Sequence, residues 1–197
     1  MPSITVYLSS SKDVDAVYHD AATALGKSIA AAGWTLVYGG NPIGLMGKLS
    51  DGARAGGGKV VGITPQLMAD EGIADKACDE LIVTTTMRER KHLLETRGDA
   101  FIAMPGGMGT FEELFEILVG RILGYHVKPI ILLNIAGYYD PLLAMIEHGI
   151  VQRFIKPRAK EAYFVATTVD GAIRHLHDCF SGRLRREHPE GEPSARE

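Results

Sequence analysis

The chain has 197 residues, of which 46% are hydrophobic and 23% are charged, and its formal net charge is −3. At roughly 100–200 residues per domain, this length predicts a single globular domain with enough apolar material for one core. The slightly acidic balance argues against the basic face that a nucleic-acid-binding protein needs, so no nucleic-acid partner is expected, but backbone dipoles could still hold a small anion.

In chain order, apolar runs and helix-like periodicities alternate. The apolar runs predict strands at residues 4–8, 34–38, 59–64, 81–85, 100–104, 129–133 and 163–165. Apolar residues at helical spacing predict helices at residues 13–32, 44–55, 87–97, 110–123, 139–152 and 169–180. Buried strands separated by helices are typical of a parallel sheet covered on both faces, so we expect a single-domain α/β protein with a doubly wound, Rossmann-like sheet.

The Rossmann-like domain is expected to cover residues 1–180. Residues 181–197 are charged and carry proline and glycine, which predicts a disordered tail. The first residues enter a strand without the features of a signal peptide, and no apolar run reaches the roughly 18 residues that span a bilayer. Cys78 and Cys179 are too few and too far apart for a disulfide framework. We therefore expect a cytoplasmic protein with no membrane partner.

The segment 105–113, which reads PGGMGTFEE, leads from a predicted strand through a glycine-rich turn into a helix. The free amides of such a helix start, from Gly106 to Thr110, and the helix dipole favour a phosphate group. The alternative is a ligand-free capping box between Thr110 and Glu113. Glu112 and Glu113 are adjacent, so their side chains must point in different directions, and one of them is free to face a bound sugar.

Two further segments are candidates for the same site. Residues 39–47 form a second glycine-rich connection, which either lines a ligand through backbone atoms or is a tight turn that allows close helix packing. On the third predicted helix, Arg90 and Lys91 share a face with apolar residues, and Arg90 could clamp a phosphate or ribose oxygen with its planar fork. From the residues alone, a surface helix with ion pairs to Glu89 and Glu95 is the favoured interpretation.

Several common nucleotide- and metal-binding motifs are missing from the sequence. The first predicted strand is not followed by G-x-G-x-x-G, which argues against a dinucleotide-dependent dehydrogenase, and no G-x-x-x-x-G-K-[ST] of a P-loop NTPase is present. The 7 histidines show neither cysteine pairing nor H-E-x-x-H spacing. We therefore expect neither a metal site nor a bound cofactor.

In this order, the segments resemble the Lonely guy (LOG) family of cytokinin-activating phosphoribohydrolases. The family motif P-G-G-x-G-T-x-x-E matches residues 105–113, its Arg-Lys pair matches Arg90 and Lys91, and its G-G-x-x-x-G-L-M-G segment matches residues 39–47. Further agreement is found at residues 123–129, 132–134 and 138–143, within a similarity that covers residues 4–155.

The resemblance implies a Rossmann-like homodimer that binds a nucleoside 5′-monophosphate. The implied reaction is hydrolysis of the N-glycosidic bond of N6-modified adenosine monophosphates or of AMP, which releases the base and ribose 5-phosphate. The resemblance also implies that Arg90 and Glu113 are the catalytic pair. The implied substrate contacts fall on Gly40, Glu71, Lys91, Gly106, Gly107, Met108, Gly109, Thr110 and Glu112.

An N-riboside breaks through an oxocarbenium-like state, which a carboxylate can stabilise while it activates water. Our hypothesis is that residues 106–110 anchor the phosphate, Glu113 faces the ribose and Arg90 orients the substrate. The rival interpretation is a non-catalytic carrier of a nucleotide or of the molybdenum cofactor, because related folds have similar glycine turns. An old description of such chains as lysine decarboxylases has no support in the residues, since no segment reads as a pyridoxal phosphate site.

The sequence departs from the pattern of the family that it resembles in three places. Ser9 replaces a glycine after the first strand, Asn41 replaces a third glycine, and Arg121 with Ile122 replaces a polar and a small residue. We expect the first two departures to reshape the nucleotide pocket. The third is expected to alter the dimer contact or the base specificity.

Overall fold

The computed structural model describes residues 1–184, so most of the expected tail lies outside the described residues. The seven strands are β1 (Ser3–Tyr7), β2 (Thr35–Tyr38), β3 (Val60–Pro65), β4 (Glu80–Thr84), β5 (Ala100–Ala103), β6 (Ile130–Leu133) and β7 (Phe164–Ala166). The helices are α1 (Ala16–Ala31), α2 (Gly44–Ala55), α3 (Gln66–Asp70), α4 (Met87–Arg97), α5 (Met108–Ile122), α6 (Asp140–Val151) and α7 (Val169–Phe180), with the 3₁₀ turns η1 (Ile135–Gly137) and η2 (Pro157–Ala162).

All seven strands pair in parallel in the order β4-β3-β2-β1-β5-β6-β7. The central strand β1 pairs with β2 on one side and with β5 on the other, so that Ile4 lies opposite both Leu36 and Ala100. The strand order therefore changes direction at β1, which makes the sheet doubly wound. The predicted single-domain, Rossmann-like α/β fold is confirmed.

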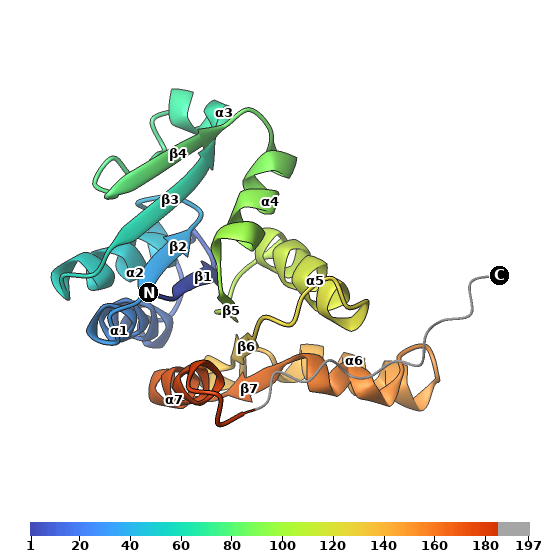
Figure 1. Cartoon of the computed structure of the whole chain (residues 1–197). Helices are drawn as coiled ribbons and strands as arrows, with labels where there is room; N and C mark the ends of the chain where they lie inside the picture. Colours follow the sequence, from blue (N-terminus) through green and yellow to red (C-terminus); the bar gives the residue numbers. More distant parts are fainter. Residues whose placement is uncertain (185–197) are drawn as a thin grey trace.

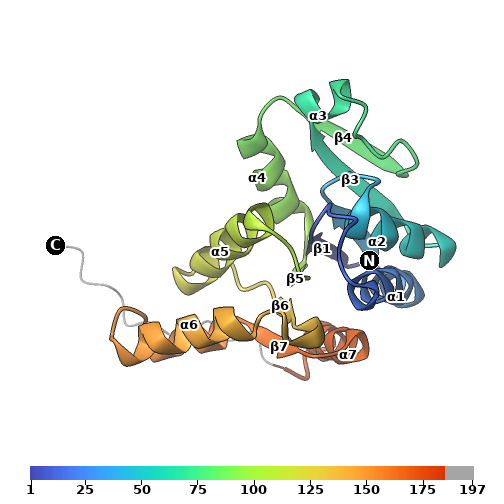
Figure 2. The ribbon, with the colours of Figure 1, turned by 180° about the vertical axis from the view of Figure 1, so that it is seen from behind.

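Two apolar clusters hold the layers together, because alternate residues of each strand point to opposite faces. Ile4 and Val6 of β1 pack with α1, α2 and α7, whereas Tyr7 of the same strand packs with α4 and α5. Figures 1 and 2 show these two groups of helices on the two sides of the sheet. The same figures show α6 running away from the body of the molecule, beside α5.

The element boundaries differ from the predictions in two informative places. The short helix α3 was not predicted, because its five residues bury no side chain and carry no apolar periodicity. Helix α5 begins at Met108 rather than at Thr110, with Gly107 as an extended N-cap that makes no side-chain cap. Thr110 is thus the third residue of the helix and is buried, so the capping-box interpretation of Thr110 and Glu113 is wrong.

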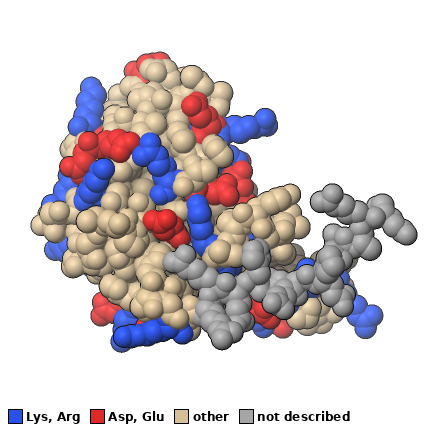
Figure 3. Space-filling view, viewed as in Figure 1, with Lys and Arg blue, Asp and Glu red and all other residues tan. Residues whose placement is uncertain are grey.

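None of the described helices is long and apolar enough to cross a membrane. On the face shown in Figure 3, Lys and Arg side chains lie among Asp and Glu side chains instead of forming one basic surface. This distribution agrees with the formal net charge of −3.

Candidate active site

A cleft of about 290 Å³ lies at the carboxyl ends of the central strands. Its walls come from the segments that follow β1, β2 and β5, together with the first turns of α2, α4 and α5. In open α/β sheets this edge, where the strand order changes direction, is the usual place for a ligand. The volume is near the lower end of the roughly 300–1,000 Å³ that small-molecule sites occupy.

The turn between β5 and α5 presents backbone amides to this cleft. Because Gly107 is the N-cap, the amides of Met108, Gly109 and Thr110 have no acceptor within the helix. Gly107 and Gly109 both line the cleft, and a Cβ added at either position would meet no atom within 4 Å. Free amides, a helix dipole and open space together form a site for an anionic group such as a phosphate.

Two tyrosines at the start of α6 brace this turn from behind. The Tyr138 hydroxyl donates to the Gly106 carbonyl at 2.5 Å, and the Tyr139 hydroxyl donates to the Met104 carbonyl at 2.6 Å. The Tyr139 amide in turn donates to the Asn134 side chain at the end of β6. The path of the glycine turn is therefore fixed by side chains that follow it at a distance in the sequence. Tyr138 lies 32 residues after Gly106.

A buried ion pair occupies the floor of the cleft. Arg90 Nη1 donates to Glu113 Oε1 at 3.1 Å, and the two residues are only 7% and 8% exposed. Arg90 is also held by its other donors, with Nε donating to the Ile63 carbonyl at 2.9 Å and Nη2 donating to the Gly39 carbonyl at 3.4 Å. The guanidinium is therefore held by three acceptors, and its fixed position in turn orients Glu113.

Gly39 at the end of β2 is required for this arrangement. A Cβ at position 39 would collide with Arg90 Nη2, and Met46 would crowd it from the other side. The absence of a side chain lets the guanidinium lie directly against the backbone. The sequence singled out the glycine-rich segment 39–47, but not the dependence of Arg90 on Gly39.

The carboxyl group of Glu113 has an unusual acidity. Burial raises the pKa of Glu113 to about 6, although the charge of Arg90 acts in the opposite direction. A carboxylate whose pKa lies near the working pH is suited to proton transfer, and buried titratable groups in clefts are candidates for functional roles.

Lys91 and Glu112 form a second, more exposed ion pair at the rim. Lys91 Nζ lies 2.7 Å from Glu112 and 3.3 Å from Glu116, and hydrogen bonding to Glu112 raises the pKa of Lys91. The adjacent residues Glu112 and Glu113 thus point to different environments, as predicted. The interpretation of Arg90 as a surface residue paired with Glu89 or Glu95 is wrong, because α4 packs this face against the sheet and α5.

The remaining wall of the cleft is partly polar and partly apolar. Ser9 and Asn41, two departures from the family pattern, both line it, which agrees with their expected influence on the pocket. Met46, Met68 and Met87 contribute an apolar side that sequence reasoning did not identify. Methionine side chains are flexible and fill irregular space, so this wall can adapt to ligands of different shape.

Four predicted contacts do not line the cleft. Glu71 is exposed at the end of α3, and Met108 is 82% exposed. Gly106 is buried behind the turn, where it contacts Thr110. Gly40 lies behind the wall, where its carbonyl accepts from the Asp75 amide at 2.8 Å.

The third departure from the family pattern, Arg121, lies outside the cleft as well. It lines a separate pocket at the far end of α5, so it does not reach a ligand in the cleft through direct contact. The expectation that Arg121 alters base specificity therefore has no structural support.

A buried carboxylate, which sequence reasoning also missed, anchors the loop that carries Gly40. Asp75 accepts hydrogen bonds from the Tyr38 hydroxyl at 2.6 Å and from Arg54 Nη1 at 2.8 Å. The Ser50 hydroxyl donates to the same carboxylate at 3.2 Å. These contacts connect β2 and α2 with the loop before β4, and so they hold one wall of the cleft in place.

Comparison with known proteins places this chain in a family. Residues 46–176 match a family model described as "Possible lysine decarboxylase". The cytokinin riboside 5′-monophosphate phosphoribohydrolase of Rhodococcoides fascians is 43% identical over 87% of both chains. The corresponding protein of Mycobacterium tuberculosis is 40% identical over 87% of this chain and 91% of its own, and LOG2 of Arabidopsis thaliana is 41% identical over 92% and 88%.

Solved structures with the same fold include two proteins connected with the molybdenum cofactor. The molybdenum cofactor carrier protein of Chlamydomonas reinhardtii has a TM-score of 0.70 and 26% identity, over 91% of this chain and 98% of its own. The molybdenum cofactor binding protein of Rippkaea orientalis has a TM-score of 0.70 and 24% identity, over 91% and 97%. The far higher identity to the phosphoribohydrolases over most of both chains shows that the chain belongs to the LOG family.

Proposed function

We propose that the protein hydrolyses the N-glycosidic bond of adenosine-type 5′-monophosphates, N6-modified ones among them, and releases the free base and ribose 5-phosphate. The observation that carries this proposal is the buried Arg90–Glu113 pair beside the free amides of α5, in one cleft. The phosphoribohydrolase names of the relatives support it, at about 40% identity over most of the chain.

The proposed substrate position follows from the geometry of α5. The 5′-phosphate lies on the amides of residues 108–110, with Gly107 and Gly109 leaving room for it. Glu113 is three to five residues further along the helix, which at 1.5 Å per residue is roughly 5–8 Å. That separation suits a carboxylate that faces the anomeric carbon of a nucleotide whose phosphate sits on the first turn.

In the proposed mechanism, the two buried residues Glu113 and Arg90 have different roles. Glu113 in its ionised form accepts a proton from water and stabilises the positive charge that develops on the ribose. The water oxygen bonds to the anomeric carbon, and the electrons of the broken C–N bond leave with the base. The base takes up a proton from solvent, and Glu113 returns the proton that it accepted to solvent. Arg90 orients Glu113 and compensates the charge near the departing base.

The base is proposed to lie along the apolar side of the cleft. Met46, Met68 and Met87 offer a flexible surface of the kind that accommodates an aliphatic N6 substituent. Lys91 and Glu112 at the rim remain candidates for contacts with the ribose or phosphate oxygens.

Lysine decarboxylation does not fit the residues of this cleft. The lysine that lines it, Lys91, is held between Glu112 and Glu116, and hydrogen bonding to Glu112 raises its pKa. A Schiff-base lysine needs the opposite environment, one that favours the neutral amine. Among the described cleft residues, therefore, none supplies the nucleophile that pyridoxal phosphate chemistry requires.

We propose further that the enzyme is a cytoplasmic homodimer that associates through α5 and α6. An apolar groove between these helices is lined by Phe115, Met145 and Phe154, of which the last two are 65% and 89% exposed. Exposed apolar surface of this kind is typical of an interface. Light scattering after size-exclusion chromatography tests the proposal, because Phe154→Glu should convert the wild-type dimer into a monomer.

The function is tested by incubating the pure protein with AMP and with N6-isopentenyl-AMP and separating the products by chromatography. Wild-type protein should release base and ribose 5-phosphate, and Glu113→Gln should lower turnover by about 10²–10⁴-fold. The matched control is Glu116→Gln, which changes an exposed carboxylate of the same helix that does not line the cleft, and it should leave turnover near normal. Near-normal turnover by Glu113→Gln would contradict the assignment of Glu113.

A second candidate function is a non-catalytic carrier, which the fold shared with the molybdenum cofactor carrier protein of Chlamydomonas reinhardtii suggests. A carrier has no need for a buried Arg–Glu pair in the floor of its site. Absence of product from both nucleotides, combined with a coloured or fluorescent pterin in the purified protein, would favour the carrier over the hydrolase.

A further inference from the structure

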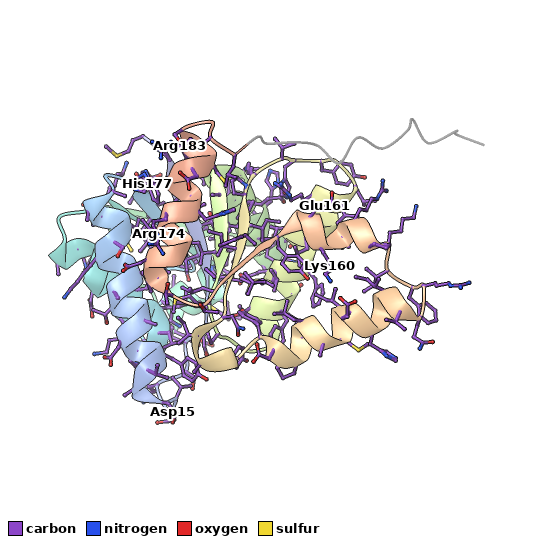
Figure 4. The ribbon with its side chains drawn as sticks, turned by 90° about the horizontal axis from the view of Figure 1, so that it is seen from below. Asp15, Lys160, Glu161, Arg174, His177 and Arg183 are labelled. Carbon is purple, nitrogen blue, oxygen red and sulfur yellow. The ribbon has the colours of Figure 1, made fainter. Side chains whose placement is uncertain are left out.

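A second pocket of about 230 Å³ lies at the opposite edge of the sheet from the cleft. It opens where β6 and β7 begin, and its walls come from the last turn of α5, from η2 and from α7. Its lining shares no residue with the cleft. Figure 4 views the molecule from below and shows α7, with Arg174 and His177 labelled, at one side and η2, with Glu161 labelled, at the other.

The cation that lines this pocket is Arg121. Its Nη1 donates to the Lys128 carbonyl at 2.6 Å, but its Nε is shielded from solvent and has no acceptor among residues 1–184. None of the ion pairs between residues 1–184 includes Arg121. Burial lowers the pKa of the Arg121 guanidinium. A half-buried cation that has no carboxylate partner within the described part of the chain is unfavourable by itself, so an anion brought to it gains a charge-assisted, two-pronged contact.

A flat aromatic wall stands beside this cation. The His175 ring stacks on the Phe164 ring with a centroid distance of 3.8 Å and an interplanar angle of 5°. Burial lowers the pKa of His175, and Arg121 acts in the same direction while Asp178 opposes it. The imidazole is therefore neutral at physiological pH, and it presents an uncharged ring face and a hydrogen-bonding nitrogen. Val127 and Pro129 add apolar surface to the same pocket.

The carboxylate of Glu161 in the lining disfavours ligands that carry more than one negative charge. Glu161 also lines the pocket, and a phosphate dianion would exceed the single positive charge of Arg121 while facing this carboxylate. A monoanion matches the charge of Arg121, and the planar guanidinium matches the two oxygens of a carboxylate. An aromatic or otherwise flat body suits the stacked wall.

We propose that this pocket binds a small aromatic monocarboxylate, with its carboxylate on Arg121 and its ring against the His175–Phe164 wall. The site is independent of the cleft, and the inference does not rest on the proposed phosphoribohydrolase activity.

Isothermal titration of the full chain with benzoate tests the proposal, with benzamide as the neutral isostere and inorganic phosphate as the competing anion. Saturable binding of benzoate, with at least tenfold weaker binding of benzamide and phosphate, is expected. Arg121→Gln should weaken benzoate binding at least tenfold, whereas Arg174→Gln, which removes an exposed arginine next to His175 in the sequence, should leave it unchanged.

Nuclear magnetic resonance of the histidine ring protons locates the ligand without any substitution of Arg121. Benzoate should shift the His175 resonance, identified by its loss in His175→Gln, and the other histidines should respond less. If Arg121→Gln does not fold, Arg121→Lys keeps the charge and loses the fork, and should still weaken binding. The proposal is overturned if benzoate does not bind, if it binds equally well to the Arg121 variants, or if it leaves the His175 resonance unmoved.

Discussion

The two glycine-rich turns of the cleft have similar sequences but different surroundings. In the turn between β5 and α5, added Cβ atoms at Gly107 and Gly109 would meet no atom within 4 Å. In the turn between β2 and α2, an added Cβ would collide with Arg90 at Gly39 and with the Ser10 and Ser11 carbonyls at Gly44. On its cleft side, at Gly107 and Gly109, the first turn leaves space for a ligand, and only Gly106 behind it is packed, against Thr110. The second turn lets parts of the protein pack against each other.

This difference teaches that a glycine in a binding site can be required for two distinct reasons. Where the space beyond the glycine is empty, a side chain should interfere with substrate binding and leave the fold intact. Where the space is filled by another residue, a side chain should move that residue and change the chemistry that it supports. The two turns therefore predict different kinetic consequences for the same substitution.

Among substitutions that test the comparison between the two turns, the largest effect is expected from Gly39→Ala. The backbone at Gly39 is outside the left-handed region, so alanine is tolerated there, but its Cβ collides with Arg90 Nη2. A displaced guanidinium misplaces Glu113, and misplacement by about 1 Å can cost 10²-fold in rate. We expect kcat to fall about 100-fold, measured by release of base from AMP. An unchanged kcat for this variant would contradict the proposal that the turn between β2 and α2 positions Arg90.

The second-largest effect is expected in the pH dependence of kcat/KM. Burial raises the pKa of Glu113 to about 6, and the proposed active form is the carboxylate, so kcat/KM should be constant above this pKa and fall as the pH drops below it. The loss is about tenfold per pH unit on the acid side. In Gly39→Ala the acid limb should move to higher pH, because Arg90 no longer lowers the pKa of Glu113 as effectively. An identical limb in both proteins would contradict this coupling.

Substitution in the open turn should affect binding instead of rate. In Gly109→Ala the new methyl group occupies the proposed phosphate position, and we expect KM for AMP to rise about tenfold, or 1.4 kcal/mol, with little change in kcat. The free energy of unfolding should increase by roughly 0.5–1 kcal/mol, because alanine is favoured over glycine in a helix.

Chemical denaturation and steady-state kinetics measure the two effects of Gly109→Ala separately. Gly171→Ala in the first turn of α7, outside the cleft, is the matched control, and it should leave KM unchanged. An unchanged KM for Gly109→Ala would contradict the proposal that the substrate phosphate binds at this turn.

The smallest effect is expected from Tyr138→Phe, which removes the hydroxyl that braces Gly106. A neutral hydrogen bond contributes about 1 kcal/mol, so kcat/KM should fall roughly fivefold. The effect should appear mainly in KM, because the brace supports the open turn and not the Arg90–Glu113 pair. A loss confined to kcat would show that Tyr138 also influences the turn between β2 and α2, which positions Arg90.

Much of the fold was predictable because strand and helix periodicities are local properties of the sequence. The seven predicted strands all exist, and α2, α4 and α7 have the predicted bounds. The environment of Arg90 was not predictable from its own helix, because its burial depends on contacts with Ile63 and Gly39, 27 and 51 residues away. The motif supplied by the family resemblance brought Arg90 and Glu113 together where spacing alone could not.

The failures of prediction have the same physical origin. Glu71 was matched to a site contact across a segment that contains the unpredicted helix α3, whose end leaves Glu71 exposed. The brace from Tyr138 and the side-chain hydrogen bonds that Asp75 accepts from β2 and α2 join residues 21 to 37 positions apart, and no local pattern reports them. Residues that position a site are therefore harder to find from sequence than residues that form a motif.

The parallel pairing of the central strands has a consequence for how the protein folds. Each parallel pair needs a crossover connection, and the register of β1 with β5 joins Ile4 to Ala100. Non-local pairings of this kind form slowly, because the intervening chain must first be ordered. Since the cleft exists only where β1, β2 and β5 end side by side, hydrolytic activity should return after helical structure during refolding, and it can serve as a reporter of the completed sheet.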